Sequence, residues 1–156
     1  MRLTEYSLQI NDGIPYLVKE KSSNFPGLKA NSPEALAEIG EKVMSLNRMA
    51  EEYLYAIALS MKCRVLGVFQ ISHGTVSSSS FMSREIFIRM LLAGAAHFVV
   101  MHNHPSGDPT PSTDDIRCTE KVREIGLMMG LPLLDHIIIG AGEDSEFYSF
   151  TENGLL

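Results

Sequence analysis

The segment 97–140 constrains the fold more than any other part of the chain. It opens with an apolar run of strand length, "HFVVMHNH" at residues 97–104, which Pro105 ends. A short polar loop leads to "STDDIRCTEKVREIGLMMG", whose apolar face recurs at helical spacing and which Gly130 can terminate. A second apolar run, "LPLLDHIIIG", follows. Two buried strands joined through a helix predict a sheet with helical cover.

The N-terminal part predicts a hairpin, a linker and a helix. "YSLQI" and "IPYLVKE" flank an Asp-Gly pair, a strong hairpin signal, although Pro15 places the second strand at an edge. Residues 21–31 are interpreted as a linker. Ser32 is a suitable N-cap and Pro33 a suitable first residue for a helix. Its apolar face comprises Ala35, Leu36, Ile39, Val43 and Leu46.

The middle of the chain alternates between segments with strand patterns and segments with helix patterns. "YLYAIALS" and "KCRVLGVFQIS" predict strands, "TVSSSSF" a short third strand, and "SREIFIRMLLAGAA" (83–96) a helix. "EFYSF" predicts the last strand. Strands mixed with helices favour an α/β or α+β layered sheet. We expect an N-terminal hairpin and linker over 1–31 and a main domain over 32–156.

Composition narrows the classes of function. With 156 residues, 45 % of them hydrophobic, the chain suits one compact domain. A formal net charge of −6 disfavours binding to nucleic-acid phosphates. Cys63 and Cys118 form no CxxC pair, and no apolar run is long enough for a signal peptide or a membrane span. We expect a reduced, cytoplasmic protein without a membrane partner.

The stretch "MHNHPSGDPTPSTDD" at 101–115 carries the strongest chemical signal. His102 and His104 are separated by one strand repeat, so both rings project from the same face. Histidine nitrogen and carboxylate oxygen are ligands of Zn²⁺, and Asp115 lies in the first turn of the following helix. An alternative is purely structural, because Ser112 and Asp115 also have the spacing of a capping box. The combination of the two patterns favours a metal site.

His102-x-His104-Pro105 followed by Ser112-x-x-Asp115 resembles the motif of JAMM (MPN+) metalloproteases. "HNHPSGDPTPSTDDIRCT", with "SREIF" before it and "LDHIIIG" and "YSF" after it, is similar to the RadC branch, over roughly Ser32 to Leu156. The resemblance implies a JAMM/MPN fold, a cytidine-deaminase-like three-layer sheet with flanking helices. Longer RadC-like chains carry a helix-hairpin-helix region associated with DNA binding, in whose place this sequence has a predicted hairpin.

The resemblance also assigns roles to individual residues. It implies that His102, His104 and Asp115 bind Zn²⁺ and that Ser112 stabilises the oxyanion. An upstream glutamate acts on water, and the alignment of "ALSMKCRVLG" puts Glu52 there. Glu51 and Glu85 are alternatives, although both have ordinary structural explanations as solvated or ion-paired groups.

Other polar residues have weaker claims. Asp135 and His136 match the family, and we interpret them as structural groups or as support behind a ligand. The amide of Asn103 points away from the two histidines and is expected to fix the loop. Ser83 stands where RadC-like chains usually have proline, so we expect it to cap its helix. His73 and His97 are interpreted as structural.

Three functions follow from these residues. The first is a zinc-dependent hydrolase that uses activated water to cleave a peptide or isopeptide-like amide. The second is a non-catalytic accessory module in DNA repair or mobile-element processes. The third, a nuclease or nucleobase hydrolase, is disfavoured by the acidic charge and by the lack of the HxE and PCxxC deaminase motifs. The substrate, the oligomeric state and the choice among divalent ions remain open.

Overall fold

The computed structural model describes residues 1–26, 30–74 and 79–156. In these ranges the chain forms a seven-stranded mixed sheet with the strand order β2-β1-β4-β3-β5-β6-β7. The strands are β1 (Arg2–Asn11), β2 (Ile14–Asn24), β3 (Tyr53–Leu59), β4 (Val65–His73), β5 (His97–His104), β6 (Leu133–Gly140) and β7 (Phe147–Ser149). The helices are α1 (Pro33–Lys42), α2 (Ser79–Leu92) and α3 (Thr113–Met128), with a short 3₁₀ turn, η1 (Leu46–Arg48).

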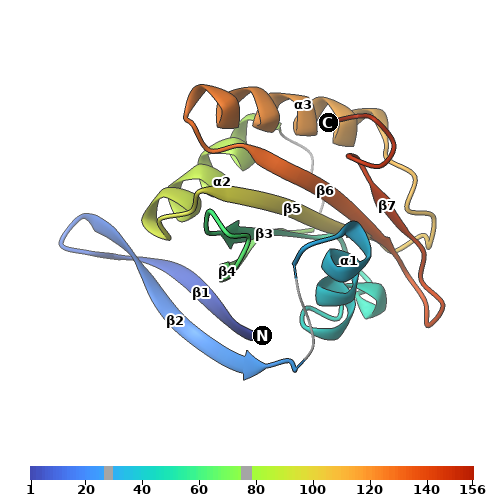
Figure 1. Ribbon diagram of the computed structural model, residues 1–156, viewed down its shortest axis with the longest axis horizontal. Coiled ribbons are helices and arrows are strands. Elements are labelled where there is room, and N and C mark those ends of the chain that lie inside the picture. Colours follow the sequence, from blue (N-terminus) through green and yellow to red (C-terminus); the bar gives the residue numbers. More distant parts are fainter. Residues whose placement is uncertain (27–29, 75–78) are drawn as a thin grey trace.

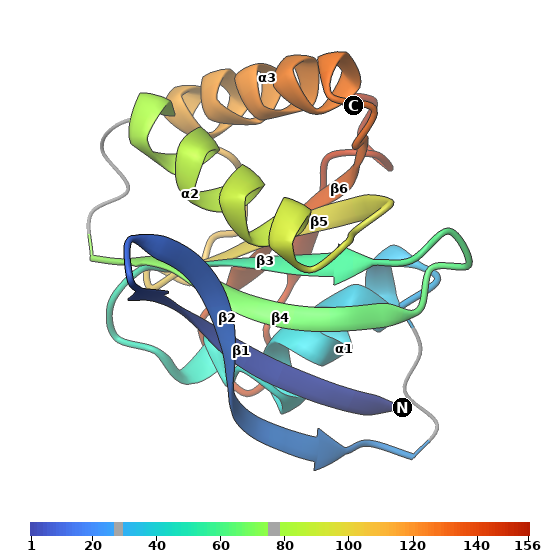
Figure 2. The same ribbon diagram turned by 90° about the vertical axis from the view of Figure 1, so that its left-hand side faces the viewer.

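The structure has three layers, with the sheet between two helical layers. Helix α1 covers one face, and α2 and α3 cover the other (Figures 1 and 2). Strand β5 shows how alternation divides the core: Val99 and Met101 pack with the α1 layer, whereas Phe98 and Val100 pack with α2 and α3. The layered α/β architecture expected from the sequence is confirmed.

The predicted strand-helix-strand unit is the part of the fold that positions the site. Strands β5 and β6 are neighbours and run parallel, so α3 must cross back over the sheet between them. Helix α3 therefore begins near the end of β5 at which His102 and His104 lie. Their side chains continue the alternation of Phe98 and Val100 and project from the face that α3 covers.

The N-terminal hairpin forms as predicted and is longer than expected. Asp12 and Gly13 both have positive φ, 51° and 78°, which suits the tight Asp-Gly turn. Pro15 lies in β2, the edge strand of the sheet, where a missing N–H breaks no ladder. Strand β2 continues to Asn24, so the first four residues of the expected linker are strand. Residues 27–29 of that linker lie outside the described ranges.

Helix α1 begins as predicted but ends early. The Ser32 hydroxyl accepts the N–H of Ala35, and Pro33 is the first residue. The helix stops at Lys42, because Ser45 adopts a left-handed conformation with φ 56°. Leu46 is nonetheless fully buried, although it lies in the η1 turn and not in α1. Its spacing in the sequence therefore correctly indicated a buried residue but not a continuous helix.

Helix α2 differs from its prediction at both ends. It begins at Ser79, so the strand predicted over 75–81 is wrong at 79–81, while 75–78 lie outside the described residues. Ser83 is therefore a buried residue within the helix instead of its cap. The helix ends at Leu92, short of residue 96, because Gly94 turns the backbone with φ 64° and the next N–H closes back onto Met90.

Both cysteines are free thiols, with Cys63 exposed and Cys118 buried in α3. Cys118 packs in the core between α3 and the sheet, so its thiol contributes to that core as a small apolar group.

Among the helices in the described ranges, none has both the length and the apolar character needed to cross a lipid bilayer.

The buried amide of Asn103 ties β5 to the segment before β3. Its Oδ1 accepts the backbone N–H of Tyr53 at 2.8 Å, and its Nδ2 donates to the carbonyl of Glu51 at 3.0 Å. Asn103 is fully buried and faces away from its histidine neighbours, as alternation requires. The expectation that it fixes the loop after β5 is wrong: its partners lie about fifty residues earlier and flank Glu52.

Replacing Asn103 with alanine should lower the free energy of unfolding by about 1–3 kcal/mol, because the N–H of Tyr53 and the carbonyl of Glu51 lose their partner. Urea unfolding followed by circular dichroism measures this loss. Asn153→Ala is the matched control, since that exposed amide makes one bond, to Ser149, at the C-terminal turn. Equal stability of the two variants would contradict the assigned role of Asn103.

Candidate metal centre

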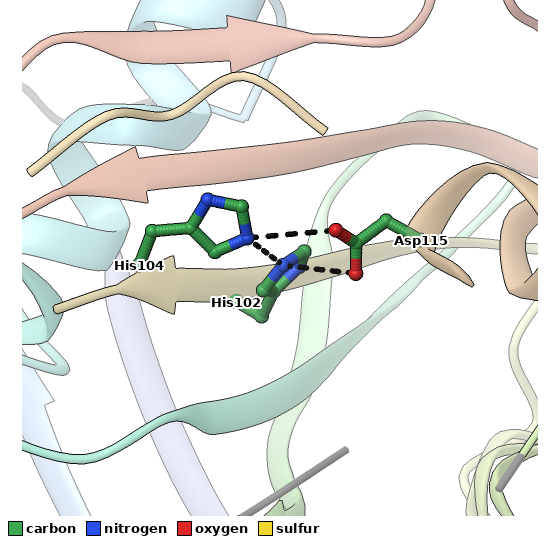
Figure 3. Close-up of side chains that lie close together, drawn as sticks. All are labelled: His102, His104 and Asp115. Atoms are coloured by element: carbon green, nitrogen blue, oxygen red, sulfur yellow. Dashed lines mark hydrogen bonds and ion pairs between the residues drawn. The ribbon is translucent and has the colours of Figure 1, made fainter. Parts of the chain in front are cut away.

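His102, His104 and Asp115 meet at the junction of β5 and α3. One ligand atom from each lies within 4.8 Å of the others. The two Nε2 atoms are 3.0 Å apart, His102 Nε2 lies 3.4 Å from Asp115 Oδ1, and His104 Nε2 lies 3.5 Å from Asp115 Oδ2 (Figure 3). The strand supplies the two imidazoles and the first turn of the helix supplies the carboxylate.

These separations fit a tetrahedral Zn²⁺ site. Ligand bonds of about 2.0–2.1 Å place neighbouring tetrahedral ligands about 3.3 Å apart. The two Nε2 atoms are 3.0 Å apart, and His102 and His104 lie 3.4 and 3.5 Å from different oxygens of Asp115. With one oxygen taken as the ligand, the three atoms lie within 4.8 Å of one another, so small rotations of these side chains bring them to the tetrahedral spacing. The donor set, two imidazoles and one carboxylate, is one that catalytic zinc sites use, with one position left for water or substrate.

The electrostatics favour the protonation states that metal ligands need. Burial lowers the pKa of His102 to about 4, so this ring is neutral at pH 7. Burial alone would raise the pKa of Asp115, but hydrogen bonds from His104 and Ser112 outweigh it and hold that pKa well below the usual range. The bond to Asp115 raises the pKa of His104. Metal uptake at this site therefore competes with a proton on His104.

The carboxylate of Asp115 serves the helix and the site together. Ser112 and Asp115 form a full capping box: Asp115 Oδ2 accepts the Ser112 N–H at 2.8 Å and its hydroxyl at 2.6 Å, and Ser112 Oγ accepts the Asp115 N–H at 3.2 Å. These bonds use Oδ2, which also faces His104, whereas Oδ1 faces His102. The structural interpretation of this pair is correct, and it is compatible with metal binding because it fixes the rotamer of the carboxylate.

The loop after β5 orients His104. The Nδ1 atom of His104 lies 2.8 Å from the backbone carbonyl of Asp108, which can only accept, so Nδ1 carries the proton and Nε2 is left to face the site. The loop is held in place at Gly107, which has φ 90° and packs against Gly140 of β6. A Cβ on Gly140 would approach the Gly107 carbonyl oxygen to 2.3 Å. Glycine is therefore required where β6 passes under the loop.

His102 is oriented by two buried residues of α3 and β6. Its Nδ1 lies 2.8 Å from His136 Nε2, and His136 Nδ1 lies 2.6 Å from the Thr119 hydroxyl. His136 thus contacts a candidate ligand from behind, one of the two roles considered for it. Reasoning from the sequence did not find Thr119. The spacing of four residues between Asp115 and Thr119, one helical turn, was the signal in the sequence that could have found it.

The three glutamates considered as the acid or base separate clearly in the structure. Glu52 is half-buried and close enough to His104 for its charge to help raise the pKa of that ring. Glu51 is exposed and pairs with His73, which thereby gains a partner that the sequence did not indicate. Glu85 forms ion pairs with Arg84 and Arg89 on α2, each at 2.8 Å. Of the three, Glu52 is the one whose charge acts on a candidate ligand, His104.

Asp135 lies next to His136 but has a structural set of partners. Its Oδ1 accepts the N–H groups of His136 at 2.8 Å and Thr151 at 3.0 Å, and its Oδ2 accepts the Ser149 hydroxyl at 2.7 Å. These bonds tie the end of β7 to β6. The structural interpretation of Asp135 therefore holds.

Comparison with known proteins supports the geometry. A model of the RadC-like JAB domain matches residues 30–155, which is most of the chain. The chain belongs to the RadC-like JAB domain family. It is similar to UPF0758 proteins from Clostridium acetobutylicum, 39 % identical over 134 residues, and Clostridium perfringens, 40 % identical over 136 residues. The first alignment covers 85 % of this chain and 56 % of that protein, and the second 87 % and 58 %.

A UPF0758 protein from Pelobacter propionicus is 43 % identical over 105 residues, which cover 67 % of this chain and 44 % of that protein. The chain therefore spans about half the length of the curated relatives that it matches. In this chain the RadC-like JAB domain, over residues 30–155, contains the His-His-Asp group.

Gly140→Ala should weaken zinc binding about 10- to 100-fold, because it displaces the loop whose Asp108 carbonyl orients His104. Overpacking should also lower stability by about 1–3 kcal/mol. Gly126→Ala is the matched control: its Cβ would meet the Leu131 carbonyl oxygen at 2.5 Å, but at the far end of α3. Isothermal titration of the metal-free proteins with zinc measures the difference. Equal zinc affinity in the two variants would contradict this account of the loop.

In the metal-free protein, His104 should titrate above the ordinary value of 6.5, because the bond to ionised Asp115 stabilises the charged ring. Zinc affinity should then fall as the pH drops through that midpoint, since the charged ring cannot bind a metal. Asp115→Asn should lower the midpoint. NMR titration of the imidazole resonances checks both statements. A midpoint at or below 6.5, or one that Asp115→Asn leaves in place, would show that the carboxylate does not control this ring.

Proposed function

We propose that the chain is a zinc-dependent hydrolase that cleaves a peptide or isopeptide-like amide bond. The observation that carries this proposal is the meeting of two Nε2 atoms and one carboxylate, within 4.8 Å, in a chain of the RadC-like JAB domain family. Because the chain spans about half of its curated relatives, the activity is proposed for this domain.

His102, His104 and Asp115 would hold the ion. When bound there, Zn²⁺ supplies a Lewis acid that makes water a competent nucleophile near neutral pH. Two imidazoles and one carboxylate also suit other first-row divalent ions, so the choice of zinc rests on the donor set together with the family resemblance.

Glu52 is the proposed general base and acid. Its half-buried carboxylate lies beside His104, and the Asn103 amide bonds the backbone on both sides of it. The carboxylate accepts a proton from the attacking water and delivers it to the amine nitrogen as the C–N bond breaks. The bonds from Asn103 limit the movement of the Glu52 backbone during both transfers.

Ser112 is the proposed donor to the oxyanion. Its hydroxyl lies at the mouth of the site, where it donates to Asp115 Oδ2 at 2.6 Å. Rotation about χ1 lets the same hydroxyl donate to a developing oxyanion, while the Ser112 N–H keeps its bond to Asp115. Loss of this donor should slow the reaction and leave the ion in place.

The charge balance of the chain disfavours a nucleic-acid substrate. The cavity next to His102 and Asp115 has a volume of about 20 Å³, room for about one water molecule, and is lined largely by buried apolar side chains, including Leu54, Ile86 and Val100. The chain carries 19 acidic and 13 basic residues, a balance that repels phosphate backbones. Apolar walls also strengthen the polar interactions made inside the site.

The experiment measures metal content by plasma mass spectrometry, on protein purified without added metal or chelator. We expect about one zinc per chain in the unchanged protein and almost none in the His102→Ala/His104→Ala double variant. His97→Ala is the control, because this histidine lies at the opposite end of β5. Glu52→Gln should keep the zinc and lose at least about 100-fold of the turnover of an isopeptide-linked peptide library.

Each step can fail separately. Absence of zinc from the unchanged protein, even after zinc is supplied, would contradict the metal site. A zinc-loaded protein whose biological phenotype survives Glu52→Gln would contradict the hydrolase and favour the non-catalytic accessory module.

A further inference from the structure

Three hydrogen bonds, two of them buried and the third partly buried, connect His102 to the backbone of α3. His102 Nδ1 lies 2.8 Å from His136 Nε2, His136 Nδ1 lies 2.6 Å from Thr119 Oγ1, and Thr119 Oγ1 lies 2.6 Å from the carbonyl oxygen of Asp115. His102, His136 and Thr119 are all less than 5 % exposed. Water therefore cannot take over any of these bonds without a change of structure.

The last bond determines which atom donates in all three hydrogen bonds. A carbonyl oxygen only accepts, so the single hydroxyl hydrogen of Thr119 must point at Asp115. Two oxygens 2.6 Å apart with no hydrogen between them would repel strongly. The Thr119 oxygen is then left to accept, and the hydrogen between Thr119 and His136 must sit on His136 Nδ1.

The same constraint extends through His136 to the candidate ligand His102. His136 is 4 % exposed, and the contacts of its ring among the described residues are with His102, Thr119 and Phe150, none of which is an acid, so the ring is neutral and carries one N–H. With that proton on Nδ1, its Nε2 presents a lone pair to His102, and His102 must donate from Nδ1. The ring of His136 is also held in orientation by stacking on Phe150, with 4.7 Å between ring centroids.

We propose that Thr119 and His136 are positioning residues that hold His102 in the Nδ1–H tautomer, so that its Nε2 lone pair faces Asp115 and His104. The consequence for an ion rests on the proposed function, whereas the tautomer itself is a property of the metal-free chain. His104 also carries a proton on Nδ1, through a direct bond to the Asp108 carbonyl. In the metal-free chain its Nε2 lies 3.0 Å from His102 Nε2, so a second proton on His104 bridges these two atoms and is the one that a metal ion would displace.

Thr119→Val removes the hydroxyl that determines the direction of these hydrogen bonds, and it keeps the side-chain volume almost unchanged. Among the residues that the structure describes, His136 then has no acceptor for a proton on Nδ1, and the hydrogen-bond partner left to its ring is His102 Nδ1. The favourable arrangement places the His136 proton on Nε2, which makes His102 Nδ1 an acceptor and moves the His102 proton to Nε2. That proton occupies the position from which a metal would be bound. Thr119→Ser keeps the hydroxyl and should keep the original tautomers.

The test is the tautomeric state of each ring in the metal-free protein, read from long-range ¹H–¹⁵N correlations on ¹⁵N-histidine-labelled samples. We expect Nδ1–H for His102 and His136 in the unchanged protein and in Thr119→Ser, and Nε2–H for both in Thr119→Val. Zinc affinity, by competition with a chelating dye, should fall about 10- to 100-fold in Thr119→Val alone. His104 should keep its Nδ1 proton in all three proteins, because the Asp108 carbonyl accepts it.

Finding Nε2–H on His102 of the unchanged protein would overturn the proposal, and this measurement does not depend on whether Thr119→Val folds. The same tautomers in the unchanged protein and in a folded Thr119→Val would also overturn it. The expected tautomers in a protein that binds no zinc would support the relay and would contradict the proposed function instead.

Discussion

The parallel pairing of β5 with β6 is the constraint from which the site follows. Two adjacent parallel strands require a crossover, and here the crossover is α3, which must start where β5 ends. A helix start is rich in unpaired N–H groups and therefore attracts a carboxylate, which Asp115 supplies as part of its cap. The strand end contributes two imidazoles from the face that α3 covers. The topology thus brings a carboxylate and two histidines together before any ligand is considered.

Capping and metal binding are usually weighed as rival explanations of a Ser-x-x-Asp sequence. In this chain both roles use the Asp115 carboxylate, and they support each other. The cap bonds Oδ2 of Asp115 to Ser112, which fixes the carboxylate with Oδ1 facing His102 and Oδ2 facing His104. A structural role for a candidate ligand therefore carries no weight against a chemical one. The distinction must come from the other groups at the site, and here these are the two Nε2 atoms that share the same focus.

Local patterns predicted what depends on near neighbours in the sequence. Strand alternation placed His102 and His104 on one face, and cap chemistry placed Ser112 and Asp115 at a helix start. The predictions failed where distant contacts decide: Ser83 lies within a helix that begins four residues earlier, and Leu46 is buried without helical continuity. The partners of Asn103 lie about fifty residues away, and those of His102 and Thr119 on β6. No periodicity reports such pairs, because they form only when the sheet assembles.

The anchors of all three candidate ligands converge on one short segment. His104 bonds the carbonyl of Asp108, Asp115 accepts the N–H of Ser112, and the relay behind His102 ends on the carbonyl of Asp115. Each anchor is a backbone group between residues 108 and 115, so the loop and the first turn of α3 orient side chains that the strand supplies. Backbone groups cannot change their donor or acceptor character, whereas hydroxyls and imidazoles can. Because these backbone groups have a fixed donor or acceptor character, the fold itself orients the lone pairs of the site. An arriving ion then needs to displace only the proton on His104.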